Sequence, residues 1–283
     1  MLSGMSISLS GDMVNKLIKY EDRICLFLDI LGFKNQVSGS LDSNHEIQRI
    51  HSGLLEIYKA FNDHFQIKKS DSYKTSKKVT QFSDSITVSY NLSEESAVYH
   101  LLNDTYMLQI DLLRWGISVR GGIAIGKLYH DEKLVFGPAL VEAVELEKYA
   151  IYPRVILSKE IIAIGKKNHA EWHSSEYEEE AIISLIEQDL DGAFYINYFG
   201  VSPYNFDDSW NDVFIYLSML KKFIEDSIRR DVSAGVNLKL KWMMNKFNNI
   251  IFDLEKENYS ILCGWEIPDD VEVDFTSINH IES

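Results

Sequence analysis

The spacing of apolar residues differs from one segment of the chain to the next, and each spacing predicts a strand or a helix. Taken in order, these segments predict the first elements of the fold. The continuous apolar run Ile24–Ile30 predicts a buried strand. Apolar residues at helical spacing over Glu46–Gln66 predict an amphipathic helix. Two short β-type runs, Val79–Ser83 and Ile86–Tyr90, flank a polar turn and predict a hairpin with Asp84 at its tip.

The next elements continue the alternation of strands and helices. A helix is expected from Ser93 to about Arg114, followed by a strand over Ile117–Ile125. Gly121-Gly122 interrupt that strand, which marks a place where a backbone or a ligand comes close. The resulting order β-α-β-β-α-β predicts an α/β (α+β) protein with a ferredoxin-like sheet, in which both helices pack on one face.

The second half of the chain begins with short elements and ends in long helices. Gly137-Pro138 open a helix through Lys148. Two strands and then two helices are expected after it, over Arg154–Leu157, Ala193–Phe199, Trp210–Arg230 and Leu238–Glu255.

Composition narrows the class of protein without naming a function. The 283 residues suit one large domain, or one domain with an appendage. A formal net charge of −15 argues against nucleic acid or an anionic membrane as the main partner. Two cysteines, Cys25 and Cys263, form no disulfide framework, so a reducing cytoplasm fits best. No apolar run approaches the ~20 residues of a membrane span.

Two aspartates carry the candidate chemistry. Asp29 ends the first apolar run and is followed by a turn at Gly32; taken alone, this is equally well a buried strand that ends in a polar turn. In a β-α-β-β-α-β sheet, however, the first strand and the hairpin can be neighbours, so Asp29 and Asp84 could meet at one edge. Two close carboxylates repel each other unless a cation lies between them, and oxygen ligands suit Mg²⁺ or Mn²⁺.

Five blocks in order resemble the class III nucleotidyl cyclase family. FLDILGF at Phe27–Phe33 is similar to the family's first metal motif, and QFSDS at Gln81–Ser85 to its second metal aspartate. The other three blocks resemble the next core strand, the glycine-started helix and the strand after it: Val119–Gly126, Phe136–Glu147 and Arg154–Lys159.

The resemblance implies a fold, a mechanism and a division of the chain. Residues 21–200 would be the cyclase catalytic domain, between a flexible leader (1–20) and a C-terminal helical extension (201–283). Asp29, Asp84 and the backbone carbonyl of Ile30 would bind two divalent ions, Mg²⁺ or Mn²⁺. Leu31, Gly32 and Phe33 would hold the β- and γ-phosphates of a nucleoside triphosphate. The family acts as a homodimer with sites at the interface.

The chain departs from the family at the residues that select purines. The lysine or glutamate four residues before the second aspartate is replaced by Thr80, and the second base-reading position is Leu134. The asparagine and arginine that stabilise the transition state fall at Val141 and Glu145. The pattern most resembles the pyrimidine cyclases of bacterial Pycsar anti-phage systems, which make cyclic CMP or cyclic UMP from CTP or UTP. That resemblance implies a separate effector protein that senses the product.

The base-reading residue is left open between two candidates. Arg120 lies in a core strand and needs a partner, which is either the base or an Asp or Glu in a structural ion pair. Thr80 could offer a hydroxyl at the base edge. Lys127 and Arg154 are weaker candidates for phosphate contact and are more simply surface cations.

Two other functions stay in competition with the pyrimidine cyclase. One is a purine cyclase with an atypical pocket. The other is a catalytically silent, nucleotide-binding cyclase-like module, favoured by Val141 and Glu145 and disfavoured by the retention of both aspartates.

Overall fold

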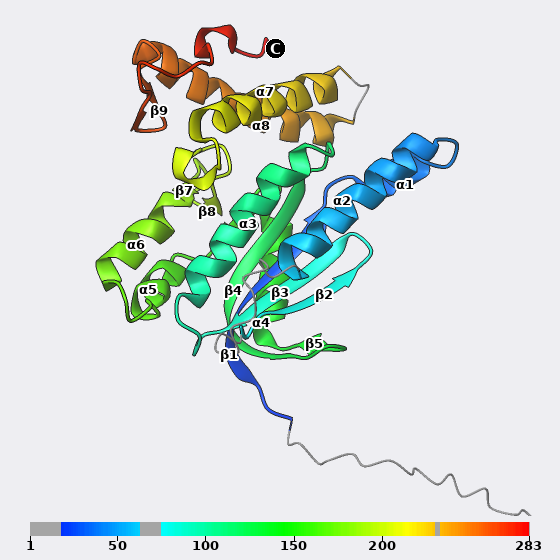
Figure 1. Ribbon diagram of the computed structural model, residues 1–283. Helices are drawn as coiled ribbons and strands as arrows, with labels where there is room; N and C mark the ends of the chain where they lie inside the picture. Colours follow the sequence, from blue (N-terminus) through cyan, green and yellow to red (C-terminus); the bar gives the residue numbers. More distant parts are fainter. Residues whose placement is uncertain (1–17, 63–74, 230–232, 283) are drawn as a thin grey trace, which may run out of the picture.

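The computed structural model describes residues 18–62, 75–229 and 233–282, and its centre is a mixed sheet (Figure 1). The first four strands are β1 (Glu21–Ile30), β2 (Lys78–Phe82), β3 (Ser85–Asn91) and β4 (Val119–His130). They lie in the order β2-β3-β1-β4, with every neighbouring pair antiparallel. This is the ferredoxin-like order, because each helical crossover joins two strands that are separated by a third. The predicted β-α-β-β-α-β core is therefore confirmed.

Further strands extend the sheet beyond β4. The complete order is β2-β3-β1-β4-β6-β8-β7, in which β6 runs parallel to β4 and the last two strands are antiparallel to their neighbours. A short strand pairs with the far end of β4, and a separate two-stranded ribbon lies near the C-terminus. The bounds are β5 (Val135–Phe136), β6 (Val155–Leu157), β7 (Ile186–Gln188), β8 (Phe194–Ile196), β9 (Ile261–Leu262) and β10 (Trp265–Glu266).

Helices cover both faces of the sheet. On one face, the even-numbered side chains of β1 join the main hydrophobic core with α2 (Asn44–Asn62) and α3 (Ala97–Leu113). Both crossover helices share this face, as expected. On the opposite face, Cys25 of β1 packs against Ala139 of α4 (Pro138–Ala150). The sheet is therefore enclosed between two helical layers where α4 crosses it, and its α4 face is the one that carries Asp29, because successive side chains of a strand alternate.

The two glycines of the Gly121-Gly122 pair allow close packing on different elements: Gly122 against α4, and Gly121 against β1 and β6. A Cβ atom at Gly122 would lie 2.2 Å from the carbonyl oxygen of Ala143, and one at Gly121 would lie 2.6 Å from that of Phe27. The expected close approach is thus made by backbone of the chain itself. The expected interruption of the strand is wrong: β4 continues unbroken to His130 because its ladder with β1 persists through both glycines.

Two long helices close the chain and join the same core. They are α7 (Ser209–Ile228) and α8 (Ala234–Lys256), seen side by side at the top of Figure 1. Their buried side chains belong to one continuous cluster with those of α3 and β1. The last segment docks on α8, because the side chain of Asn248 bonds both the N–H and the carbonyl of Ile281, at 2.8 and 3.0 Å. The predicted boundary between the catalytic domain and the C-terminal extension, near residue 200, stays a prediction. One hydrophobic core contains residues from both sides of that boundary.

Other elements differ in detail from the sequence prediction. The helix expected from Ser93 begins only at Ala97, because Ser96 has a left-handed φ of 53° and Ser93 lies in the turn before it. The remaining short helices are α1 (Phe33–Gly39), α5 (Glu160–Lys167), α6 (Ser175–Ser184), η1 (Pro203–Asn205) and η2 (Phe275–Ser277).

Some predictions fall on residues that the structure does not describe. The first 17 residues of the expected leader and the last four of the helix predicted over Glu46–Gln66 lie outside the described ranges. Among the helices that are described, none combines the length and the apolar character needed to cross a membrane.

Candidate functional site

The structure brings Asp29 and Asp84 to the same end of the sheet. Asp29 is the penultimate residue of β1, and Asp84 lies in the turn between β2 and β3. Residues Asp29 and Ser85 face each other in the ladder between β1 and β3. The N–H of Ile30 donates to the carbonyl of Asp84 at 3.1 Å, which ties the turn to the end of β1. The hairpin thus fixes the second aspartate beside the first.

Asp29 lies in an environment that disfavours its charge. Partial burial raises the pKa of its carboxyl, and the neighbouring carboxylates of Asp84 and Glu147 raise it further, while Arg120 opposes them. The hydroxyl of Ser85 donates weakly to Asp29, at 3.5 Å. A carboxylate held among other carboxylates is a place where an added cation relieves repulsion.

Arg120 lies directly opposite Asp29, on β4. Its guanidinium forms a close ion pair with Glu147 of α4, and one nitrogen lies 3.9 Å from the carboxylate of Asp29. The structural ion pair weighed from the sequence is therefore present. Base recognition by Arg120 stays a prediction.

Glu147 belongs to this site but was missed by the sequence analysis. Its side chain is 5% exposed and points from α4 toward the sheet. The sequence feature that indicates the burial of Glu147 is its position in α4. The buried residues Ala139, Ala143 and Ala150 recur there at helical spacing, and Glu147 lies on the same face of the helix. An acid in such a stripe requires a buried partner, and Arg120 supplies it.

The turn after β1 offers fewer free N–H groups than the resemblance implied. Gly32 has a left-handed φ of 72°, and the space beside its Cα is open. The N–H of Leu31 donates to the carbonyl of Ser118 at 3.0 Å, so it is already engaged. In the described part of the chain, the N–H groups of Gly32 and Phe33 donate to no acceptor. A phosphate contact in this turn stays a prediction and falls on these two groups.

Thr80 takes part in a polar network on the same face of the sheet as Asp29. Its hydroxyl lies 3.0 Å from Nε2 of His130, and the hydroxyl of Ser89 lies 2.8 Å from Nδ1 of that ring. Arg23 donates to Ser89 at 2.9 Å. Burial lowers the pKa of His130 to about 4, with Arg23 and Lys78 adding to the shift, so the ring is neutral at pH 7.

His130 could not be assigned to this network from the sequence. It is the last residue of β4, beyond the part of that strand that pairs with β1. Thr80 of β2 faces Thr87 of β3, which in turn faces Phe27 of β1. Thr80 therefore lies on the same face of the sheet as Asp29 but two strands away from it, in the row of residues next to that of Asp29.

Leu134, the second base-reading position, and the two transition-state positions Val141 and Glu145 have exposed side chains. Leu134 is 59% exposed in the turn between β4 and β5. Val141 is 60% exposed, and Glu145 is also exposed on the outer side of α4. Neither of these two α4 side chains can reach Asp29, because both point away from the sheet.

The two weaker cation candidates have separate roles. Lys127 pairs with Asp22 at the surface, at 2.7 Å, as an ordinary surface cation would. Arg154 is fully buried and is held by Asp189 at 2.5 Å and by Asp191. The expectation that Arg154 is a surface cation is therefore wrong, because two acids of the turn between β7 and β8 enclose it.

A lysine from the C-terminal helices feels the charges of the Asp29 site. Lys239 of α8 is half-buried. Burial and the charge of Arg120 lower its pKa, while Glu147 and Asp29 raise it. The four charged groups are therefore within electrostatic reach of one another, although Lys239 and Asp29 are 210 residues apart in sequence.

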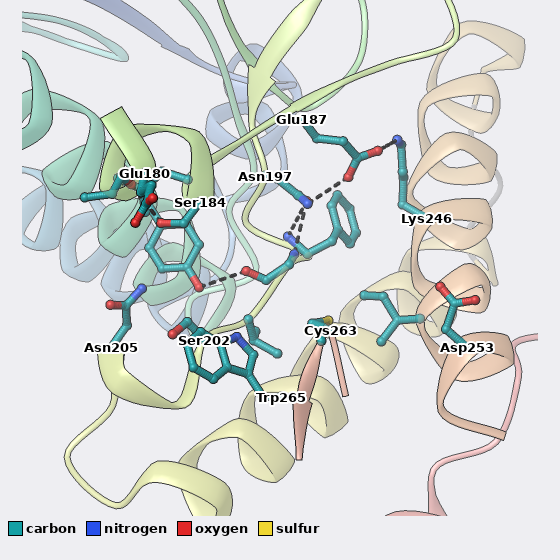
Figure 2. Close-up of a pocket in the computed structure, with 18 of the residues that line it drawn as sticks. Glu180, Ser184, Glu187, Asn197, Ser202, Asn205, Lys246, Asp253, Cys263 and Trp265 are labelled. Carbon is teal, nitrogen blue, oxygen red and sulfur yellow. Dashed lines mark hydrogen bonds and ion pairs between the residues drawn. The ribbon is translucent and has the colours of Figure 1, made fainter. Parts of the chain in front are cut away.

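A separate cavity of about 890 Å³ lies between the edge of the sheet and the end of α8 (Figure 2). Glu187 spans one wall, where it accepts from Asn197 at 2.7 Å and from Lys246 at 2.6 Å. Tyr106 and Trp265 contribute aromatic surface. This cavity has no lining residue in common with the Asp29 site, and its one lysine, Lys246, is already paired with Glu187.

The donor set at Asp29 and Asp84 suits a hard divalent ion that shares its shell with a substrate. Within the described ranges, no group of three or more His, Cys, Asp or Glu side chains is arranged to hold a metal ion. Two carboxylates alone leave most of a shell to water and to phosphate oxygens, which is how Mg²⁺ commonly binds at phosphoryl-transfer sites. The residues therefore fit such an ion together with a nucleotide.

Comparisons with known proteins found no matching family model and no matching curated protein. Among solved structures, the chain is similar to the adenylyl cyclase CyaB from P. aeruginosa, with a TM-score of 0.40, 14% identity and coverage of 53% of this chain and 82% of that one. It is also similar to the catalytic core of a rhodopsin-guanylyl cyclase with converted specificity in complex with ATPαS, with a TM-score of 0.37, 15% identity and coverage of 52% and 81%.

A third similar structure is a bacterial light-regulated adenylyl cyclase, with a TM-score of 0.41, 11% identity and coverage of 71% of this chain and 58% of that one. The mixed α/β fold itself is established by the sheet order and the two helical layers described above.

Proposed function

We propose that the protein is a metal-dependent nucleotide cyclase whose site is built on Asp29 and Asp84. The observation that carries the proposal is the pairing of these two aspartates at one end of a ferredoxin-like sheet, where the pKa of Asp29 is raised by burial, Asp84 and Glu147. A structural carboxylate normally has partners that stabilise its charge, whereas at Asp29 burial, Asp84 and Glu147 together outweigh the stabilising effects of Arg120 and Ser85.

Asp29, Asp84 and the backbone carbonyl of Ile30 would hold two divalent ions, Mg²⁺ or Mn²⁺. When bound, such ions neutralise triphosphate charge and favour ionisation of a coordinated hydroxyl. The protein's own part is positioning: β1 and the β2–β3 turn fix the two carboxylates, and the N–H groups of Gly32 and Phe33 would donate to the β- and γ-phosphates.

The reaction follows from this arrangement. The 3′-hydroxyl of a nucleoside triphosphate would lose its proton to solvent water and attack the α-phosphorus of the same molecule. The new bond closes the 3′,5′-cyclic phosphate, and the bond to the β-phosphate oxygen breaks to release pyrophosphate. Catalysis consists mainly of charge neutralisation and in-line positioning, as in other phosphoryl transfers.

The finer proposal is a pyrimidine substrate, CTP or UTP, yielding cyclic CMP or cyclic UMP. Its support is that Thr80 and Leu134 stand where purine cyclases carry their base-reading residues, and that Thr80 is bonded to a neutral His130. A small hydroxyl and an imidazole suit the edge of a pyrimidine better than a charged lysine or aspartate code would.

The biological setting is proposed from the same resemblance. The product would act as a second messenger in anti-phage defence and would be sensed by a separate effector protein. The enzyme would work as a homodimer, which suits the outward direction of Val141 on α4. The free cysteines Cys25 and Cys263 suit a reducing cytoplasm.

A silent nucleotide-binding module is the second candidate. The observation that favours it is the exposed pair Val141 and Glu145, which cannot supply the family's transition-state contacts. A purine cyclase with an atypical pocket is the third, and only the identity of the product separates it from the first.

The deciding experiment incubates the protein with each of the four radiolabelled nucleoside triphosphates and Mn²⁺ and separates the products by chromatography. A cyclic pyrimidine product supports the complete proposal. A cyclic purine product keeps the mechanism and overturns the pyrimidine assignment. If a folded dimer yields no product from any of the four, the cyclase proposal is wrong and the silent module replaces it.

A further inference from the structure

A second cavity, of about 310 Å³, lies between the N-terminal turn of α3, the segment before α6 and α6 itself. Its described lining residues include two acids, Glu95 and Glu178, and no lysine or arginine. The lining also includes the aromatic rings of Tyr99, Trp172 and Tyr177. A cavity of this size and composition accommodates a small ring-containing ligand, and its negative charge disfavours an anion such as a triphosphate.

The cavity lies away from the Asp29 site. Strand β3 begins at Ser85, the cross-strand neighbour of Asp29, and ends at Asn91, and α3 starts only after that end. The first turn of α3 is therefore at the opposite end of the sheet from Asp29, beside α5 and α6 (Figure 1). None of the residues that line the cavity belongs to the Asp29 site. A ligand held here would be separate from the nucleotide.

Glu178 is the buried acid of this cavity, and only one of its two oxygens is engaged. Its side chain is 2% exposed. Oε2 accepts from the hydroxyl of Ser96 at 3.0 Å and lies 2.6 Å from Nε2 of His173. The other oxygen, Oε1, is buried and has no hydrogen-bond partner among the described residues. A buried carboxylate oxygen without a partner is costly, and a donor that enters the cavity would remove that cost.

His173 provides a second unpartnered atom in the same cavity. Its side chain is 9% exposed, and its Nδ1 has no hydrogen-bond partner in the described part of the chain. Because a carboxylate can only accept, the Nε2 atom that bonds Glu178 carries a proton, and in the neutral ring Nδ1 is then an acceptor. Two residues in contact therefore offer one free acceptor each, which a ligand with two N–H donors would satisfy.

Aromatic rings surround this pair of residues. Trp172 packs edge-on against His173 with ring centroids 4.2 Å apart, and Tyr177 packs against the same imidazole at 5.2 Å. Trp172 is nevertheless 80% exposed, so it lies at the rim of the cavity and not in the core. An exposed indole beside a carboxylate is a suitable surface for an organic cation, because the face of the ring attracts positive charge.

We propose that this cavity is a second ligand site, which binds a small organic cation with N–H donors, such as an amidinium, a guanidinium or a protonated aminoheterocycle. Glu178 accepts a charge-assisted hydrogen bond from the ligand through Oε1, and His173 accepts a second one through Nδ1. Trp172 covers the ligand at the rim. The site is independent of the proposed cyclase reaction, because it shares no residue with the Asp29 site.

Calorimetry with benzamidine and with benzamide tests this site. The two compounds have the same size and shape, but only benzamidine is positively charged. The titrations are made in EDTA at pH 8, where a free imidazole is neutral. We expect benzamidine to bind at least about tenfold more tightly than benzamide, because only the cation gains the charge-assisted hydrogen bond to Glu178. Equal binding of the two compounds, or binding of neither, would overturn the inference.

Three variants test where benzamidine binds, and thermal melts show that each is folded. Glu178→Gln keeps an acceptor for Ser96 but replaces the free oxygen with an amide donor, so it should weaken binding about tenfold. Trp172→Leu should weaken it about threefold through loss of the indole face. Glu176→Gln, an exposed acid of the same helix, is the matched control and should change nothing.

The remaining outcomes separate this cavity from other acidic places on the protein. If Asp29→Asn or Asp253→Asn weakens benzamidine binding and Glu178→Gln does not, the cation is held at the Asp29 site or in the cavity of Figure 2, and the inference is wrong. Equal weakening by Glu176→Gln and Glu178→Gln would be an effect of general charge and would also overturn it. If Glu178→Gln does not fold, Trp172→Leu decides, and unchanged binding in that variant contradicts the inference.

Discussion

Two charged clusters on the α4 side of the molecule differ in how far their acidic side chains are matched by cations. Around Arg154, every charge is matched: Asp191 pairs with the guanidinium, which lowers the pKa of that carboxyl, and Asp189 accepts from Arg154 and Trp242. Around Arg120, the charges are not matched, and the pKa of Asp29 is raised. The cluster around Arg154 stabilises the fold without any ligand, whereas the carboxylates around Arg120 would be fully neutralised only by a bound cation.

The largest expected effect is on the unmatched cluster. Asp29→Asn or Asp84→Ala should lower cyclisation by more than about 10³-fold, because each change removes a metal ligand. Since the folded pKa of Asp29 is raised, its ionised form opposes folding at pH 7, and Asp29→Asn should leave the melting temperature in EDTA unchanged or higher. Pyrophosphate release and thermal melts measure the two effects. An active or an unfolded variant would contradict the metal assignment.

The matched cluster should respond in the opposite sense. Arg154→Met leaves Asp189 buried without its main partner and should lower the free energy of unfolding by about 3–5 kcal/mol. Urea unfolding measures this loss, with Arg114→Met as the control because Arg114 is largely exposed. A stability loss below about 1 kcal/mol would show that the cluster does not hold the fold.

A third prediction concerns pH and the network around His130. The folded pKa is about 4 against an ordinary 6.5, so between these values the unfolded chain binds more protons than the folded one. Stability should therefore fall as the pH drops from 6.5 toward 4, by about 2–3 kcal/mol from this residue. Urea unfolding at pH 7 and pH 5 should show a shallower loss in His130→Asn than in the wild type. Equal slopes would mean that His130 is not held neutral; exposed His45→Asn is the control.

The smallest expected effect concerns the preference between CTP and UTP. Thr80→Val removes the hydroxyl that bonds His130 and keeps the shape of the side chain. If this pair contacts the base, the ratio of kcat/KM for CTP and UTP should change by about tenfold, the size of one hydrogen bond. Thr276→Val, at an exposed position far along the chain, should leave the ratio unchanged. A ratio that Thr80→Val does not alter would remove Thr80 from base recognition.

Much of the core could be predicted because local periodicity and topology agree there. The strands predicted from the run Ile24–Ile30 and from the hairpin around Asp84 nearly coincide with the observed strands β1, β2 and β3. Once the β-α-β-β-α-β order is accepted, the antiparallel neighbours follow, and with them the meeting of Asp29 and Asp84. Local pattern therefore specified the pair that carries the proposed chemistry.

The rest of the site depends on packing between distant elements, which periodicity does not encode. Glu147 meets Arg120, the cross-strand neighbour of Asp29, only because α4 crosses one face of the sheet. His130 meets Thr80 only because β4 continues past its ladder with β1. Arg154 was assigned to the surface because the two acids that enclose it lie 35 and 37 residues further along the chain.

The most direct test of the central claim compares the wild type with Asp29→Asn in one assay. Each is incubated with the four nucleoside triphosphates and Mn²⁺, and pyrophosphate and cyclic nucleotide are quantified together. The account predicts that the wild type forms both products in equal amounts from a pyrimidine triphosphate and that Asp29→Asn forms neither. Equal activity in the two proteins, or no product from a folded wild type, would contradict it.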